Sequence, residues 1–127
     1  MGKGFKKLLV WQRARDLAID VYKITEQGRS KRDYGLTDQM RRSSVSIPSN
    51  IAEGDERNSD KDSIRFFNIA KGSLAELRTQ LDIANHINYL DEDVFRDLDE
   101  KALTIGKMLG SLIKARSISP QPIAHSP

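Results

Sequence analysis

The chain has 127 residues, of which 38% are hydrophobic and 31% are charged, and its formal net charge is +3. This length predicts one domain with a single core. No run approaches the ~20 apolar residues that span a bilayer, and the absence of cysteine excludes disulfides, zinc-thiolate sites and thiol nucleophiles. Gln12 and Arg13 end the first apolar run too early for a signal peptide. We therefore expect a cytoplasmic protein without a membrane segment.

A first helix is predicted from about Val10 to Gln27, with Gly28 as its stop. The residues after it, 29–35, are polar and typical of a turn. Apolar residues at helical spacing form the stripe that we expect to be buried: Val10, Ala14, Leu17, Val21 and Ile24.

A second helix is predicted from a cap at Thr37 to about Glu53, before Gly54. Pro48 lies inside it and lacks the amide that would bond to the carbonyl of Ser44, so we expect a kink there. Small hydroxyl side chains interrupt the stripe and predict a close approach by another helix. The expected stripe is Leu36, Met40, Ile47 and Ile51.

Two longer helices follow, the third capped by Ser59 or Asp60 and the fourth by Asp91 or Asp93. Gly72 and Ser73 disfavour the third helix, the glycine by about 1 kcal/mol, which indicates close contact with another helix. The expected buried residues are Phe67, Ala70, Leu74, Leu77, Leu81, Ala84 and Ile87 in the third helix, and Val94, Leu98, Ala102, Ile105, Leu109 and Leu112 in the fourth.

Four amphipathic helices joined by short loops predict an all-α fold, an antiparallel up-down-up-down four-helix bundle with its second helix kinked at Pro48. The bundle is expected to occupy residues 1–116. Residues 117–127 contain three prolines and are expected to form a flexible tail.

Positive charge is concentrated in the first half of the chain, where residues 1–57 carry 12 Lys and Arg against 8 Asp and Glu. Three clusters, at residues 3–15, 29–32 and 41–42, supply most of it. On one surface they would attract a polyanion with salt-sensitive affinity. The alternative is an ordinary solvated charged face.

Residues with catalytic chemistry are few, which disfavours an enzyme. The two histidines are His86 and His125, and the residue three before His86 is Ile83, so the Glu-x-x-His pattern of bundle di-iron sites is absent. We expect no metal and no cofactor. The polar residues of the second helix are assigned instead to assembly or to support of the kink: Ser46, Pro48, Asn50 and Glu53.

The motifs resemble those of the bacterial four-helix-bundle proteins encoded in intervening sequences of large-subunit ribosomal RNA genes. The resemblance covers about residues 9–90. It depends on Val10-Trp11-Gln12, Tyr34-Gly35-Leu36, Gln39-Met40-Arg41-Arg42, Val45-Ser46-Ile47-Pro48-Ser49-Asn50-Ile51-Ala52-Glu53-Gly54 and Ala70-Lys71-Gly72-Ser73-Leu74-Ala75-Glu76-Leu77.

This resemblance implies a bundle that assembles into a homopentamer without established enzymatic activity. A related branch contains the accessory variability proteins of diversity-generating retroelements, which are basic pentamers that bind nucleic acid and partner a reverse transcriptase. The residues that carry over are Arg41, Arg42, Asn50 and Glu53. Departures from the family pattern are the basic joint at residues 27–33 and the pair Ser43-Ser44, where members often have two alanines.

Two functional hypotheses follow. The first is a non-enzymatic homo-oligomer, expected to be a pentamer, that binds RNA or DNA through a basic surface. The second is a scaffold or accessory subunit of a reverse transcriptase, in which Arg41 and Arg42 form salt bridges across subunits. The predicted nucleic-acid-binding residues are Arg13, Arg29, Lys31, Arg32, Arg41 and Arg42.

Overall fold

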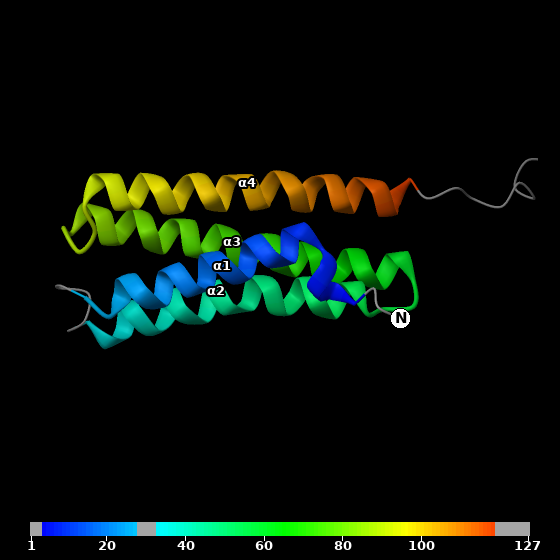
Figure 1. Ribbon diagram of the computed structural model, residues 1–127, viewed down its shortest axis with the longest axis horizontal. Coiled ribbons are helices and arrows are strands. Elements are labelled where there is room, and N and C mark those ends of the chain that lie inside the picture. Colours follow the sequence, from blue (N-terminus) through cyan, green and yellow to red (C-terminus); the bar gives the residue numbers. More distant parts are fainter. Residues whose placement is uncertain (1–3, 28–32, 119–127) are drawn as a thin grey trace, which may run out of the picture.

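A computed structural model of the chain describes residues 4–27 and 33–118. Within these ranges the chain is helical and contains no strand, which confirms the predicted all-α class. Figure 1 shows four long helices running alternately up and down, preceded by one short 3-10 helix. The elements are η1 (Phe5–Lys7), α1 (Leu9–Thr25), α2 (Tyr34–Asp55), α3 (Asp60–His86) and α4 (Glu92–Ser117).

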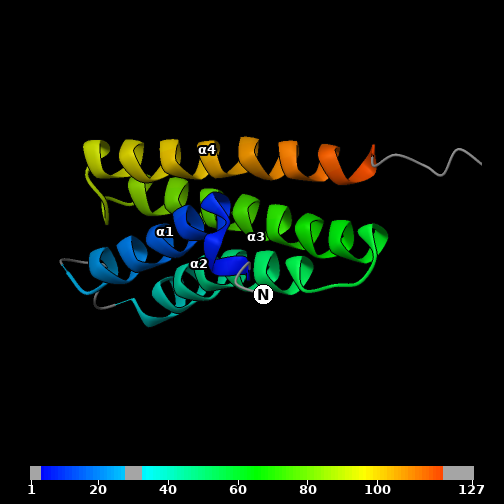
Figure 2. The same cartoon turned by 45° about the vertical axis from the view of Figure 1, so that its right-hand side comes forward.

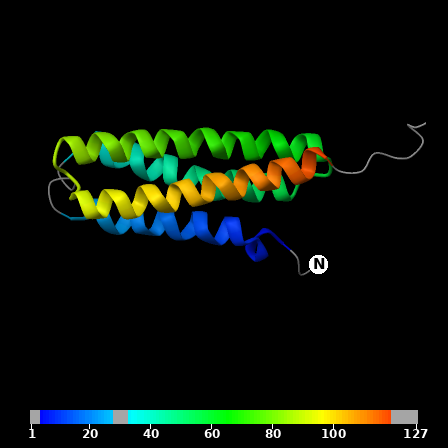
Figure 3. The same ribbon diagram turned by 90° about the horizontal axis from the view of Figure 1, so that it is seen from above.

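Each long helix packs against its two neighbours in the chain order, and α4 closes the ring against α1. The contact between α2 and α3 is the most extensive of the four and that between α1 and α4 the least. Figures 2 and 3 show this arrangement from two further directions. The predicted up-down-up-down bundle is therefore confirmed. The predicted tail begins at the end of α4, and its residues from 119 onward lie outside the described ranges.

The core follows the predicted stripes because residues three and four apart share one helix face. Five expected members differ. Ile87 is 43% exposed because it lies just past the end of α3. Four others are only half-buried: Ile24, Leu36, Val94 and Leu112. The largest fully buried side chains include Phe67, Leu17, Met40, Ile47, Ile51, Leu77, Leu81 and Leu98.

The start of α2 corrects the predicted cap at Thr37. The cap lies four residues earlier, at Asp33, whose Oδ1 atom accepts a hydrogen bond from the Leu36 amide at 3.0 Å. Thr37 is instead a buried residue of the first turn. The second oxygen of Asp33 accepts from the Tyr89 hydroxyl at 3.1 Å, so this cap also holds the α3–α4 turn.

The turn between α3 and α4 depends on Asn88, whose φ of 65° lies in the left-handed region that asparagine tolerates better than most residues. This geometry lets the carbonyl of Ala84 accept from the amides of Tyr89 at 2.8 Å and Leu90 at 3.3 Å. The side chain of Asn85 donates to the Leu90 carbonyl at 3.2 Å. The turn is therefore closed by its own backbone, and Leu90 is buried beneath it.

The close approach of helices occurs at Gly54 rather than at the predicted Gly72. A Cβ atom on Gly54 would lie 2.5 Å from Phe67 Cε1 and 3.0 Å from the carbonyl oxygen of Ser63, whereas one on Gly72 would meet nothing within 4 Å. The hydroxyl of Ser63 donates to the Gly54 carbonyl at 2.6 Å. This glycine therefore sets the spacing between the end of α2 and the start of α3.

Pro48 is buried inside α2, and the helix continues through it to Asp55. The missing amide does not end the helix, and the angle of the expected kink stays a prediction.

No helix in the described ranges is long and apolar enough to cross a membrane.

Candidate functional site

Arg41 is half-buried and joins α2 to α1. Its Nε atom donates to Thr25 Oγ1 at 2.8 Å, and its guanidinium carbon lies 4.6 Å from the centre of the Tyr22 ring. Thr25 is 1% exposed and its hydroxyl donates in turn to the Val21 carbonyl at 2.7 Å. A guanidinium stacked on a ring and bonded to a buried hydroxyl is held in one orientation. Arg41 is therefore first of all a tie between two helices of one subunit.

Arg42 occupies a very different environment although it is the next residue. Its side chain is 79% exposed, and its Nε atom lies 3.0 Å from Asp38 Oδ2 one turn earlier. Surface pairs of this kind contribute about 0.3–0.5 kcal/mol and are readily exchanged for another anion. Arg42 is the member of the pair that is open to an external partner.

Arg13 is exposed on α1 and lines the groove between α1 and α4. It precedes Thr25, the α1 contact of Arg41, by twelve residues, which corresponds to about 18 Å along the helix. The structure therefore does not bring Arg13 together with Arg41. The remaining predicted basic residues, Arg29, Lys31 and Arg32, lie outside the described residues.

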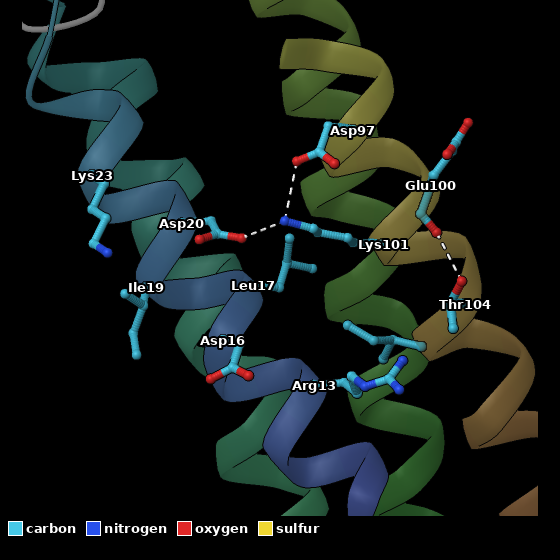
Figure 4. A pocket seen from close by; sticks show the side chains of 11 residues that line it. Arg13, Asp16, Leu17, Ile19, Asp20, Lys23, Asp97, Glu100, Lys101 and Thr104 are labelled. Carbon is cyan, nitrogen blue, oxygen red and sulfur yellow. Dashed lines mark hydrogen bonds and ion pairs between the residues drawn. The ribbon is translucent and has the colours of Figure 1, made fainter. Parts of the chain in front are cut away.

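The groove beside Arg13 has a volume of about 750 Å³ and carries charges of both signs (Figure 4). Lys101 spans it, with Nζ 2.9 Å from Asp20 Oδ2 and 3.1 Å from Asp97 Oδ2. Hydrogen bonds to these carboxylates raise the pKa of Lys101. The charged lining consists of Arg13, Lys23 and Lys101 against Asp16, Asp20, Asp97 and Glu100. With more carboxylates than cations, this groove is not suited to a polyanion.

The predicted polar network of α2 forms in part. Ser46 Oγ lies 2.8 Å from Ser73 Oγ of α3, and the Asn50 amide donates to Ser46 Oγ at 3.0 Å and to the Ser46 carbonyl at 2.9 Å. Pro48 lies on the same stretch of helix, whereas Glu53 pairs with Arg57. The network therefore bonds α2 to α3 within the bundle, and Glu53 is separate from it.

An apolar hollow on the α1–α2 face was missed by the reasoning from sequence. It has a volume of about 340 Å³ and is lined by Ile19, Tyr22, Val45 and Pro48 among others. Ile19, Tyr22 and Val45 are 44%, 43% and 40% exposed and line one hollow together. The sequence feature that indicates this hollow is the three-residue spacing of Ile19 and Tyr22, which puts both on one helix face beside the stripe that faces the core.

Groups with catalytic potential do not converge in the described part of the chain. His86 is exposed at the end of α3, and its Nδ1 atom contacts the Asp82 carbonyl at 2.9 Å. Within the same residues, no three His, Cys, Asp or Glu side chains are grouped so that they could hold a metal ion.

Comparison with known proteins agrees with this geometry. The family model of the 23S rRNA-intervening sequence protein matches residues 6–111. A solved structure of a protein of unknown function from the S23 ribosomal protein family of Bacteroides thetaiotaomicron is similar, with a TM-score of 0.77 and 25% sequence identity. The match covers 84% of this chain and 99% of that chain. No curated protein matches the sequence.

Proposed function

This chain belongs to the 23S rRNA-intervening sequence protein family, and we propose that it acts as a non-enzymatic, self-assembling helical module that binds RNA. The observation that carries the proposal is the exposed apolar hollow between α1 and α2. Burying such a surface removes apolar area from water and favours association. A pentamer is the expected oligomer, because the related proteins that the motifs resemble form that assembly.

The rim of the hollow supports a second copy of the chain as the partner. Arg15, Lys23 and Glu26 surround the apolar residues, so both signs of charge border one patch. An adjacent subunit can place opposite charges against them while the apolar centres meet. Electrostatic complementarity of this kind selects the partner and fixes its register.

RNA binding is supported by the net charge of +3 per subunit, which assembly multiplies around one particle. Arg42 is exposed in the first half of α2, and the sequence adds Arg29, Lys31 and Arg32 in the preceding joint. The family description refers to intervening sequences of 23S ribosomal RNA, which makes structured RNA the first probe.

A protein-binding scaffold, such as an accessory subunit of a reverse transcriptase, is the second candidate function. The position of Arg41 favours it, because this side chain is stacked on Tyr22 at the edge of the apolar hollow and is committed to α1. Arginines held in one orientation are common at the centre of protein interfaces.

The assembly test uses two matched substitutions and light-scattering mass. Ile19→Glu introduces a charge at a 44% exposed residue of the hollow, and Ile69→Glu does so at a 42% exposed residue of α3. We expect the first variant to fall to monomer mass and the second to keep the mass of the natural protein. Equal masses for all three would contradict assembly through α1 and α2.

The RNA test replaces Arg29, Lys31 and Arg32 with Glu and measures affinity for a structured RNA at several salt concentrations. We expect weaker binding and a shallower salt dependence. With fewer phosphate contacts, binding releases fewer counterions from the RNA. Unchanged affinity and slope would show that this joint does not contact RNA. Failure of the natural protein to bind at low salt would favour the scaffold function.

A further inference from the structure

The first described residues of the chain combine positive charge with a fixed backbone. Residues 4–15 contain Lys6, Lys7, Arg13 and Arg15 and no acidic residue, and the first carboxylate of the chain is Asp16. Lys6 and Lys7 are exposed, and within the described residues neither lies in an ion pair. By contrast, Arg42, Arg57 and Arg96 each pair with a carboxylate one turn away. Lys107 and Lys114 of α4 are likewise exposed and outside ion pairs among the described residues. What sets Lys6 and Lys7 apart is that they are adjacent in one short helix.

The short helix η1 holds these two lysines in place. The side-chain amide of Gln12 donates to the Lys6 carbonyl at 2.8 Å, and the amide of Lys7 donates to the Gly4 carbonyl at 3.2 Å. Figure 1 shows η1 folded back against the bundle, where it contacts both α1 and α2. A backbone ordered before binding lowers the entropy lost when a ligand is bound.

Two aromatic rings anchor this segment to α1. The ring centres of Phe5 and Trp11 lie 5.2 Å apart at an interplanar angle of 59°, and Trp11 packs against the core. The guanidinium carbon of Arg15 lies 5.2 Å from the centre of the Trp11 ring. This guanidinium also pairs with Asp16 at 3.0 Å, so it fixes the Trp11 ring rather than adding free charge.

We infer that η1 is a contact site for the phosphate backbone of RNA, with Lys6 and Lys7 as the binding residues. This inference rests on the proposed RNA binding and adds the place where the strand is held. Lysine ammonium groups bind phosphate as point charges without reading bases, so the contact is independent of sequence.

Nucleic acid fits this segment better than an anionic membrane surface does. A membrane anchor presents a continuous apolar face to the lipid. Here both aromatic rings are half-buried and packed, and the large apolar side chain exposed in residues 4–15 is Leu9, at 52%. The segment thus offers charge with little apolar surface to insert.

The test compares two double charge reversals with the same change in net charge. Lys6→Glu with Lys7→Glu alters η1, and Lys107→Glu with Lys114→Glu alters two exposed lysines of α4 as a control. Affinity for a short oligouridylate is measured by fluorescence anisotropy across a salt series. Circular dichroism checks that both variants remain folded.

We expect the η1 variant to bind more weakly and to lower the slope of log affinity against log salt by about 1.4, since each single-strand phosphate contact contributes about 0.7. The α4 control should keep most of the natural slope. Equal losses in both variants would overturn the inference, because net charge alone would then explain binding. A natural protein that binds no RNA at low salt would instead overturn the proposed function on which the inference rests.

Vesicles of phosphatidylcholine with phosphatidylserine form the second arm of the experiment. We expect little binding of the natural protein to them. Vesicle binding that disappears in the η1 variant, while oligouridylate binding is retained, would overturn the inference and assign the segment to a membrane surface.

Discussion

The interface between α2 and α3 and the interface between α1 and α4 lie on opposite sides of the bundle and are built in opposite ways. Small side chains bring α2 and α3 together, with Gly54 against Phe67 and Ser46 bonded to Ser73. Between α1 and α4 lies the charged groove of about 750 Å³, bridged by Lys101. We therefore expect the stability of the bundle to depend more on the tightly packed α2–α3 interface, and substitutions to be tolerated better at the open α1–α4 interface.

The largest effect is expected from Gly54→Ala. The added methyl group would lie 2.5 Å from the Phe67 ring and 3.0 Å from a backbone oxygen, so the two helices must move apart. Overpacking of this kind costs about 1–3 kcal/mol. The measurement is the free energy of unfolding in urea.

Gly72→Ala is the matched control for that change, because its methyl group meets nothing within 4 Å. Alanine is the better helix former, so stability should rise by up to about 1 kcal/mol. If both alanine variants were stabilised, the tight approach at Gly54 would be refuted.

A smaller effect is expected from Ser73→Ala, which removes the hydroxyl bonded to Ser46 across the same interface. A hydrogen bond of this kind contributes about 0.5–1.5 kcal/mol. A double-mutant cycle with Ser46→Ala isolates the pair, and a coupling energy near zero would mean that the hydroxyls do not stabilise the α2–α3 interface.

The smallest effect is expected from Lys101→Met on the open side. The Lys101 side chain is 47% exposed, and surface ion pairs contribute less than about 1 kcal/mol. Since the pKa of Lys101 is raised above its ordinary 10.5, its contribution is complete below pH 10.5 and is lost as pH rises through the raised value. Urea unfolding at neutral and at strongly alkaline pH should show the difference between variant and natural protein only at neutral pH. If Lys101→Met lowered the free energy of unfolding as much as Gly54→Ala does, the α1–α4 interface would be as important for stability as the α2–α3 interface.

The helices could be predicted because their apolar spacing alone determines which face is buried. The contacts between helices could be predicted in part: Ser73 meets Ser46 of α2, and Ser43 meets Gln80 of α3, as their small side chains predict. Spacing does not say which glycine meets a neighbour, and Gly54 rather than Gly72 is the contact. The cap at Asp33 was missed for a related reason. Part of its role is a bond to Tyr89, 56 residues away in the chain.

The candidate surfaces were predicted less well than the fold. Arg41 and Arg42 are adjacent in sequence but point about 100° apart on a helix, so one is committed to α1 while the other is exposed. Counting positive charges along the sequence cannot tell the half-buried arginine from the exposed one. The 3-10 helix at Phe5–Lys7 has no periodic pattern to reveal it, and its position became known only from its bonds to α1.

Because the bundle has an even number of antiparallel helices, its first helix begins and its last helix ends at the same end, so the two ends of the bundle differ. The short helix η1 and the end of α4 lie toward one of them, and the α3–α4 turn, tied to Asp33 by Tyr89, lies at the other (Figure 1). In a cyclic assembly every subunit has the same orientation along the axis. Such a ring would have the lysines of η1, the α2–α3 connection and the end of α4 on one side, and the end of α1, the start of α2 and the α3–α4 turn on the other, so a strand or partner could distinguish its two faces.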